Sequence, residues 1–190
     1  MRTRVWMRGV VGGLALAGAL AGCDVPPAPQ AVEEPTARAT AAAGAECPEG
    51  GVRAFEGTGD AAMGLRVAQI QLVNCGAQPY VLEGHPDIRV LDGQRRPVEV
   101  SVGQGSNGIS SATGLDAAPQ RVTLQPGEAA SVGLLWRNLV TDAAVPAVEG
   151  WVLDIGPRPG APRLTLALKN SIDLGNTGKL GVGAWTPLRR

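Results

Sequence analysis

Three cysteines and one histidine are the side chains of this 190-residue chain best suited to covalent or metal chemistry. Cys23 ends an apolar run, Cys47 and Cys75 lie further along, and His85 stands between a glycine and a proline. One histidine and two cysteines that can bridge each other fall short of the ligand set of a usual zinc or copper site. We therefore expect no metal and no cofactor, and a separate role for each of these side chains.

Cys23 stands in a sequence suited to lipid attachment. Leu20-Ala21-Gly22-Cys23 has the form of a lipobox, in which small residues precede a cysteine whose thiol receives a diacylglyceryl group. Arginines and a short apolar stretch come before it, as in a secretory signal. The uncharged run from position 9 to 22 is too short to span a bilayer about 30 Å thick. We expect residues 1–22 to be a lipoprotein signal peptide; the alternative is an ordinary signal peptide followed by a chance cysteine.

A diacylglyceryl group on Cys23 predicts where the protein is held. Two acyl chains, at about 0.8 kcal/mol per buried methylene, anchor a protein stably where one chain does not. The expected localisation is extracytoplasmic, at the outer face of the cell membrane. Residues 23–46 are rich in proline and alanine and lack apolar periodicity, which predicts a disordered, extended tether. The folded domain is expected over residues 47–190.

Cys47 and Cys75 remain as an even pair once Cys23 carries lipid. In an oxidising compartment such a pair predicts a disulfide. The bond would close a loop of about 29 residues and stabilise the domain by about 3 to 4 kcal/mol. Two free thiols are the alternative.

Short runs of alternating apolar and polar residues follow Cys47, separated by glycine and proline turn signals, and no window keeps a helical period. The pattern predicts an all-β fold, an immunoglobulin-like β-sandwich. A slip in the phase between Val67 and Ile70 predicts a β-bulge there. The expected strands cover residues 65–73, 80–83, 87–92, 97–102, 120–125, 129–137, 150–155, 163–168 and 179–185.

Two familiar kinds of site are disfavoured by the sequence. Residues 103–108 match the glycine pattern of dinucleotide sites, but Gly114 and Pro119 interrupt the helix that such a site requires. We expect a flexible loop there, and neither Ser106 nor Ser110 lies in a serine-nucleophile motif. A formal net charge of zero argues against nucleic acid as a partner. We expect no catalytic residues.

The three tryptophans of the expected domain differ in their position within the apolar–polar alternation of their strands. Trp136 and Trp151 share the phase of aliphatic neighbours and are expected in the core. Trp185 is out of phase with Leu180 and Val182 and is expected to face outward, where its ring can stack on a sugar. The polar residues expected beside it are Asn170, Asp173 and Asn176.

His85 lies in a Gly-His-Pro turn and is expected to place its ring at a sheet edge. With Trp185 it is a candidate ligand contact.

Several longer motifs have the character of one family. They are Leu72-Val73-Asn74-Cys75, Leu82-Glu83-Gly84-His85-Pro86, Val122-Thr123-Leu124-Gln125-Pro126-Gly127-Glu128, Leu135-Trp136-Arg137-Asn138 and Leu174-Gly175-Asn176-Thr177-Gly178. Over roughly residues 47–188 the chain resembles secreted bacterial lipoproteins catalogued as domain of unknown function 4232. The resemblance implies an immunoglobulin-like sandwich and no known activity.

The function expected from these features is that of a non-catalytic, lipid-anchored binding module of the cell envelope, whose partner is an envelope protein or a glycan. A carbohydrate- or cell-wall-binding module is the first alternative. An envelope hydrolase with its site on the loops 103–119 and 138–147 is the second.

Overall fold

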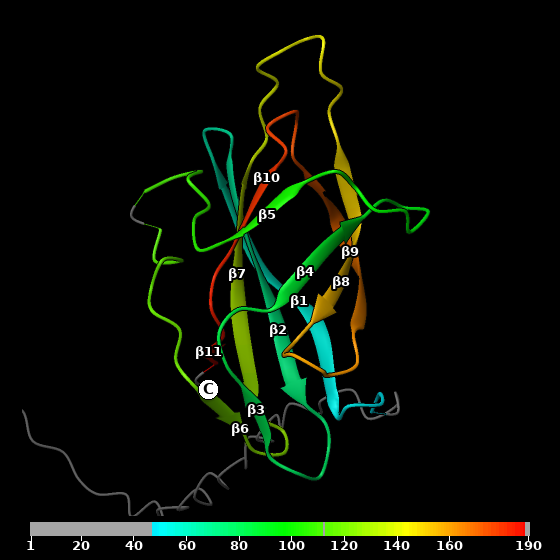
Figure 1. The fold of residues 1–190 in the computed structure, drawn as a ribbon, viewed down its shortest axis with the longest axis vertical. Coiled ribbons are helices and arrows are strands. Elements are labelled where there is room, and N and C mark those ends of the chain that lie inside the picture. The colour runs from blue at the N-terminus through cyan, green and yellow to red at the C-terminus, as the bar shows by residue number, and fades with distance from the viewer. Residues whose placement is uncertain (1–46, 112, 189–190) are drawn as a thin grey trace, which may run out of the picture. The chain divides into compact units, whose positions relative to one another are not determined.

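The computed structural model describes residues 47–111 and 113–188, which form an all-β domain without helices (Figure 1). The all-β sandwich class expected from the sequence is confirmed. The expected signal peptide, Cys23 and the expected tether lie outside the described residues. Among the residues that are described, no helix is long and apolar enough to cross a membrane.

Eleven strands are present in the described part of the chain. They are β1 (Val52–Ala62), β2 (Leu65–Asn74), β3 (Tyr80–Leu82), β4 (Asp87–Leu91), β5 (Ser101–Gln104), β6 (Val122–Leu124), β7 (Ala129–Arg137), β8 (Glu149–Gly156), β9 (Leu164–Asp173), β10 (Lys179–Val182) and β11 (Thr186–Pro187).

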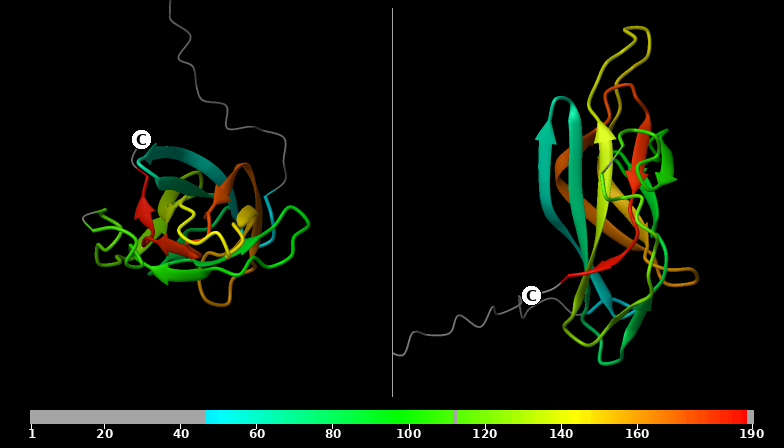
Figure 2. Two further views of the ribbon diagram at one scale, coloured as in Figure 1. Left: turned by 90° about the horizontal axis from the view of Figure 1, so that it is seen from above. Right: turned by 90° about the vertical axis from the view of Figure 1, so that its left-hand side faces the viewer.

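The strands form two facing layers and a small closing pair (Figure 2). The larger sheet has the order β1-β2-β7-β10-β5, and β11 pairs with the first part of β7. The smaller sheet has the order β4-β8-β9, while β3 and β6 pair with each other at one end of the sandwich. Neighbouring strands are antiparallel except β5 and β10, which are parallel.

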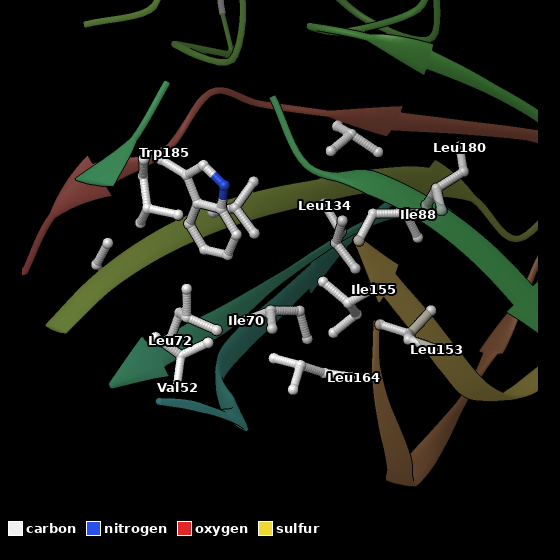
Figure 3. Close-up of a cluster of buried hydrophobic side chains, with 14 of the residues drawn as sticks. Val52, Ile70, Leu72, Ile88, Leu134, Leu153, Ile155, Leu164, Leu180 and Trp185 are labelled. Carbon is white, nitrogen blue, oxygen red and sulfur yellow. The ribbon is translucent and has the colours of Figure 1, made fainter. Parts of the chain in front are cut away.

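The core lies between the two layers (Figure 3). Alternate residues of β2 and β7, such as Ile70 and Leu134, face Leu153 and Ile155 of β8, and all four are buried. This alternation is the period-two pattern that the sequence shows, because successive side chains of a strand point to opposite faces. The strand pattern therefore positions the apolar side chains as expected.

β1 is a strand that the sequence pattern did not predict. Only Val52 among its residues is fully buried, and its second half is exposed. It pairs with β2 alone and forms an edge of the larger sheet. An edge strand with one exposed half carries little apolar alternation, which explains why the pattern failed there.

The strand expected over residues 97–102 is wrong in its first half. Pro97 forms an isolated bridge with Leu91, and the Val98 amide donates to Val90 O at 2.9 Å. This segment therefore returns alongside β4, and pairing with β10 begins only at Ser101.

The bulge expected within β2 is at the right place but belongs to the neighbouring strand. β2 pairs with β7 in unbroken register over its length. On its other side, Glu56 pairs with Ile70 and Gly59 with Ala68, so β1 passes two residues where β2 passes one. The extra residue is therefore in β1, where a bulge bends the strand.

Candidate functional site

Cys47 and Cys75 form the predicted disulfide. Cys75 directly follows β2, and Cys47 opens the described domain. The amides of Cys75 and Gly76 both donate to Gly51 O, at 3.0 and 2.9 Å. The bond therefore ties the point where the chain enters the domain to the end of a strand inside the larger sheet.

The outward orientation expected for Trp185 is wrong. Its side chain is 1% exposed and lies in the core (Figure 3), with Nε1 donating to Pro157 O at 3.0 Å. Val182 pairs with Leu134, but Thr186 pairs with Ser131, so the segment after β10 advances by four residues while β7 advances by three. The extra residue reverses the alternation and turns the indole inward. Trp185 is not available as a platform for a sugar.

Trp136 is buried as expected, with 7% of its surface exposed, whereas the core position expected for Trp151 is wrong. Trp151 is 40% exposed and lies beside Gly93. It lies at an irregularity in the pairing of β8 with β9: Gly150 pairs with Ile172 and Val152 with Ala167, so Trp151 alone is opposite residues 168–171 of β9. The irregularity breaks the alternation that places Leu153 in the core.

His85 is half-buried, and it lines a surface hollow of about 430 Å³ together with Asp87, Arg158 and Arg163. The neighbouring Gly84 accepts a hydrogen bond from the Trp185 amide at 3.1 Å. The backbone at Trp185 therefore lies next to the backbone preceding His85, but the indole is inside the core and His85 is at the surface. They do not form one site.

An ion-pair cluster stands beside His85 on the outer face of the smaller sheet. Arg163 Nε lies 2.9 Å from each carboxylate oxygen of Asp154, and Arg163 Nη1 donates to the carboxylate of Asp87. Burial alone lowers the pKa of Arg163, but the hydrogen bonds and charges of Asp154 and Asp87 outweigh it and raise the pKa above its ordinary value. The cluster ties β4 and β8 to the start of β9.

The glycine-rich segment 103–108 forms no helix, as expected, but it is anchored. The Gly105 amide donates to Val182 O at 2.8 Å, and Asn107 Nδ2 donates to Ser101 O and Leu180 O. Asp116 accepts from the Ser106 amide at 2.8 Å. The hydrogen bonds from the Gly105 amide and the Asn107 side chain fix the segment against β10.

The loop at residues 138–147, the other half of the expected hydrolase site, is fixed by one side chain. Asn176 accepts from the Thr141 amide at 2.8 Å and donates to the carbonyls of Asp142 and Val145. Gly175 has a φ of 53°, and a Cβ there would collide with Leu139 O, so only glycine allows this approach. Among the described residues of these loops, no hydroxyl group donates a hydrogen bond to a carboxylate or to a histidine.

A cleft of about 510 Å³ opens between the two layers, where β1 and β9 lie next to each other. Two irregularities face each other across it: the bulge of β1 after Glu56, and residues 168–171, which β9 inserts opposite Trp151. Bulges of this kind are found beside functional sites because they redirect side chains. We take this opening, here called the inter-sheet cleft, as the candidate functional site.

The inter-sheet cleft has an apolar floor and polar walls. The floor consists of Ala68, Ile70, Leu134 and Trp136, which point inward from β2 and β7. The polar residues that line it are Glu56, Asp60, Arg66, Asn170, Ser171 and Asp173. Asn170 and Asp173, expected beside Trp185, therefore lie beside Trp136 instead.

Two hydrogen-bond donors of the cleft are incompletely satisfied within the described residues. Nε1 of Trp136 is buried and has no hydrogen-bond partner among the described residues. Arg66 pairs in register with Trp136, is half-buried, and its guanidinium donates only to the carbonyl of the preceding Leu65 within the described part of the chain. No group of three His, Cys, Asp or Glu residues among those described is arranged to hold a metal ion.

The acceptors of the cleft already hold the domain together. Glu56 accepts from the Lys169 amide at 2.9 Å, which joins β1 to β9. Asp173 accepts from Asn138 Nδ2 at 2.8 Å and from the Gly175 amide at 2.9 Å. The sequence pattern did not predict this grouping; Asn170, which interrupts the apolar alternation of β9, was the one available signal.

One family model matches most of the domain. The family described as Domain of unknown function (DUF4232) matches residues 47–186, which include the disulfide and the inter-sheet cleft. The resemblance noted from the sequence motifs is confirmed for these residues. No curated protein and no solved structure matches the chain significantly.

Proposed function

The chain belongs to the DUF4232 family of domains of unknown function, and we propose that it is a lipid-anchored, extracytoplasmic binding domain of the cell envelope. The observation that carries the proposal is the Cys47–Cys75 disulfide. Disulfides persist in oxidising compartments outside the cytoplasm. A structural disulfide at the entry of the domain therefore supports secretion of the chain.

The sequence around Cys23 supports the anchoring. Cys23 ends a lipobox and precedes the disulfide by a proline-rich segment, residues 24–46. An extended chain of that length reaches about 70 Å at about 3.1 Å per residue. Such a segment allows the domain to act at a distance from the membrane that holds Cys23.

The inter-sheet cleft supports a binding role. Its volume of about 510 Å³ lies within the range of ligand pockets, about 300 to 1,000 Å³. Its carboxylates accept hydrogen bonds from backbone amides of the domain, and the buried indole N–H of Trp136 has no partner among the described residues. This chemistry suits recognition of a ligand, and the proposed role is non-catalytic.

Substitution of the lipobox cysteine tests the anchoring. We expect Cys23→Ser to move the protein from the membrane fraction to the soluble extracytoplasmic fraction, because the thiol that accepts the diacylglyceryl group is lost. Mass spectrometry of the wild-type N-terminus should show a diacylglyceryl group on Cys23.

The Cys47→Ser and Cys75→Ser double variant serves as the matched control, since it removes cysteines from the chain without leaving a free thiol in the domain and keeps Cys23. This variant should remain in the membrane fraction. Unchanged membrane association of Cys23→Ser, or an unmodified Cys23 in the wild-type protein, would refute the anchoring.

A further inference from the structure

We propose that the inter-sheet cleft binds an uncharged sugar. This inference rests on the proposed binding function and names the chemical class of the ligand. It depends on four features of the cleft: an indole N–H without a partner and a guanidinium without an ion pair in the described part of the chain, neighbouring carboxylates and an apolar floor.

The unmatched donors require acceptors. Trp136 is more than nine-tenths buried, lines the cleft, and leaves Nε1 without a partner among the described residues. A buried donor without a partner is costly, and each such group in a native fold calls for an explanation. Arg66, adjacent to it across the β2–β7 pair, adds a second set of free N–H groups. A ligand oxygen reaching this corner would satisfy both.

The carboxylates of the cleft can accept further hydrogen bonds. Glu56, Asp60 and Asp173 each accept at least one backbone or side-chain hydrogen bond, and each carboxylate has further acceptor capacity. A hydroxyl group both donates and accepts, so a ligand with several hydroxyls can match donors and acceptors within one opening. Sugars carry hydroxyls at this density.

The balance of charge disfavours an anionic ligand. Three carboxylates line the cleft against one guanidinium. An anionic sugar would meet like charges, which discriminate against a partner more strongly than a missing contact does. The apolar floor of Ile70 and Leu134 suits the C–H face of a sugar ring.

The wall contributed by β9 adds uncommitted polar groups. The side chains of Asn170 and Ser171 make no hydrogen bond within the described residues, and both line the cleft. Residues 168–171 have no partner on β8, because they form the insertion opposite Trp151. The insertion turns these polar groups toward the opening rather than toward a strand.

The indole resonance of Trp136 gives a direct test. The full chain, isotope-labelled at the tryptophan indole nitrogen and kept in detergent, is titrated with cellotetraose, maltotetraose and the tetrasaccharide of N-acetylglucosamine. At least one of these should shift the Nε1–H resonance of Trp136 and leave those of Trp151 and Trp185 in place. Tetragalacturonate and an N-acetylated alanine tetrapeptide should shift it less.

Variants of the cleft test the contacts. Arg66→Gln and Asn170→Ala should each weaken binding of the responding sugar by about fivefold, the value of one hydrogen bond. Arg89→Gln, on the outer face of β4, is the matched control and should leave binding unchanged. Trp136→Phe assigns the resonance; where it fails to fold, Arg66→Gln and Asn170→Ala decide.

Two results would overturn the inference: no neutral sugar shifts the Trp136 resonance at millimolar concentration, or the anionic sugar or the peptide shifts it equally. A chain that is lipidated on Cys23 and binds no sugar contradicts this inference alone. A chain that binds the sugar but carries no lipid contradicts the anchoring alone. The two experiments therefore separate the two failures.

Discussion

Trp185 donates its indole N–H to Pro157 O at 3.0 Å from inside the core, where it links the segment after β10 to the end of β8. The ring lies in the core, on the side of the cluster where Ile70 and Leu72 lie (Figure 3). A tryptophan in this position contributes both packing and one buried hydrogen bond.

We expect Trp185→Phe to destabilise the domain by about 2 to 4 kcal/mol, because it leaves a cavity and an unsatisfied carbonyl at Pro157. Chemical denaturation followed by circular dichroism measures the change in the free energy of unfolding. Trp151→Phe is the matched control and should cost less than about 1 kcal/mol, since Trp151 is 40% exposed. Equal losses in the two variants would contradict the assignment of Trp185 to the core.

For the tryptophan side chains, the sequence predicted burial correctly where strand pairing is regular and incorrectly where the register shifts. Trp136 lies in the unbroken β2–β7 register, and its alternation placed it correctly. Trp151 and Trp185 each lie at a register shift, and both were placed wrongly. A shift of one residue moves a side chain to the other face, and the local pattern around Trp151 and Trp185 does not reveal these two shifts.

The turn that follows β4 is held by one carboxylate. Asp92 accepts from the amides of Gln94 and Arg96 at 2.8 and 2.9 Å and from Arg96 Nε at 2.8 Å. The hydrogen bond from the Arg96 amide is the main reason that the pKa of Asp92 lies below its ordinary value. The carboxylate thus fixes the turn that contains Gly93, the residue beside the Trp151 ring.

This turn should loosen in acid. A depressed carboxyl pKa in the folded state contributes stability above the unfolded pKa and loses it as the pH falls through the folded pKa. The amide resonances of Gln94 and Arg96 should therefore titrate together, with a midpoint below 3.8, the ordinary value for this carboxyl. Asp92→Asn should abolish the titration, and a midpoint at or above 3.8 in the wild-type protein would refute the assignment.

Among the elements, the paired central strands were predictable and the edges were not. The expected range 129–137 is the range observed for β7, which has neighbours on both sides and is buried on most positions. β1 has one neighbouring strand and an exposed half. The segment 97–100 begins by running back alongside β4 and does not take part in the pairing of β5 with β10. Edges depend on contacts distant in the chain, which leave little mark on local alternation.

For the molecule as a whole, the disulfide is the largest single constraint on the unfolded chain. Cys47 and Cys75 are separated by 28 positions, and closing a loop of this size stabilises a fold by about 3 to 4 kcal/mol. Denaturant unfolding with and without reductant should show this loss as a lower midpoint. The Cys47→Ser and Cys75→Ser double variant should match the reduced protein, and equal midpoints in both conditions would contradict the expectation.

The inter-sheet cleft belongs to this scale and was not predictable. Its residues run from Glu56 to Asp173, and they meet only because β1 and β9 are the facing edges of different sheets. The sequence showed Asn170 and Asp173 as polar residues near a tryptophan, but it associated them with the wrong one. Which tryptophan they meet depends on how the two sheets are stacked, and the alternation within one strand carries no information on that.

The bond between Cys47 and Cys75 also determines the route by which mechanical force enters the domain. Tension on the chain upstream of Cys47 reaches the end of β2 through the two sulfur atoms, in parallel with the backbone path through β1. β2 has neighbours on both sides, whereas β1 has one and is the easier strand to peel away. If one end of the protein is held and its cleft is bound to a fixed structure, the disulfide would therefore make it harder for tension to separate β1 from β2.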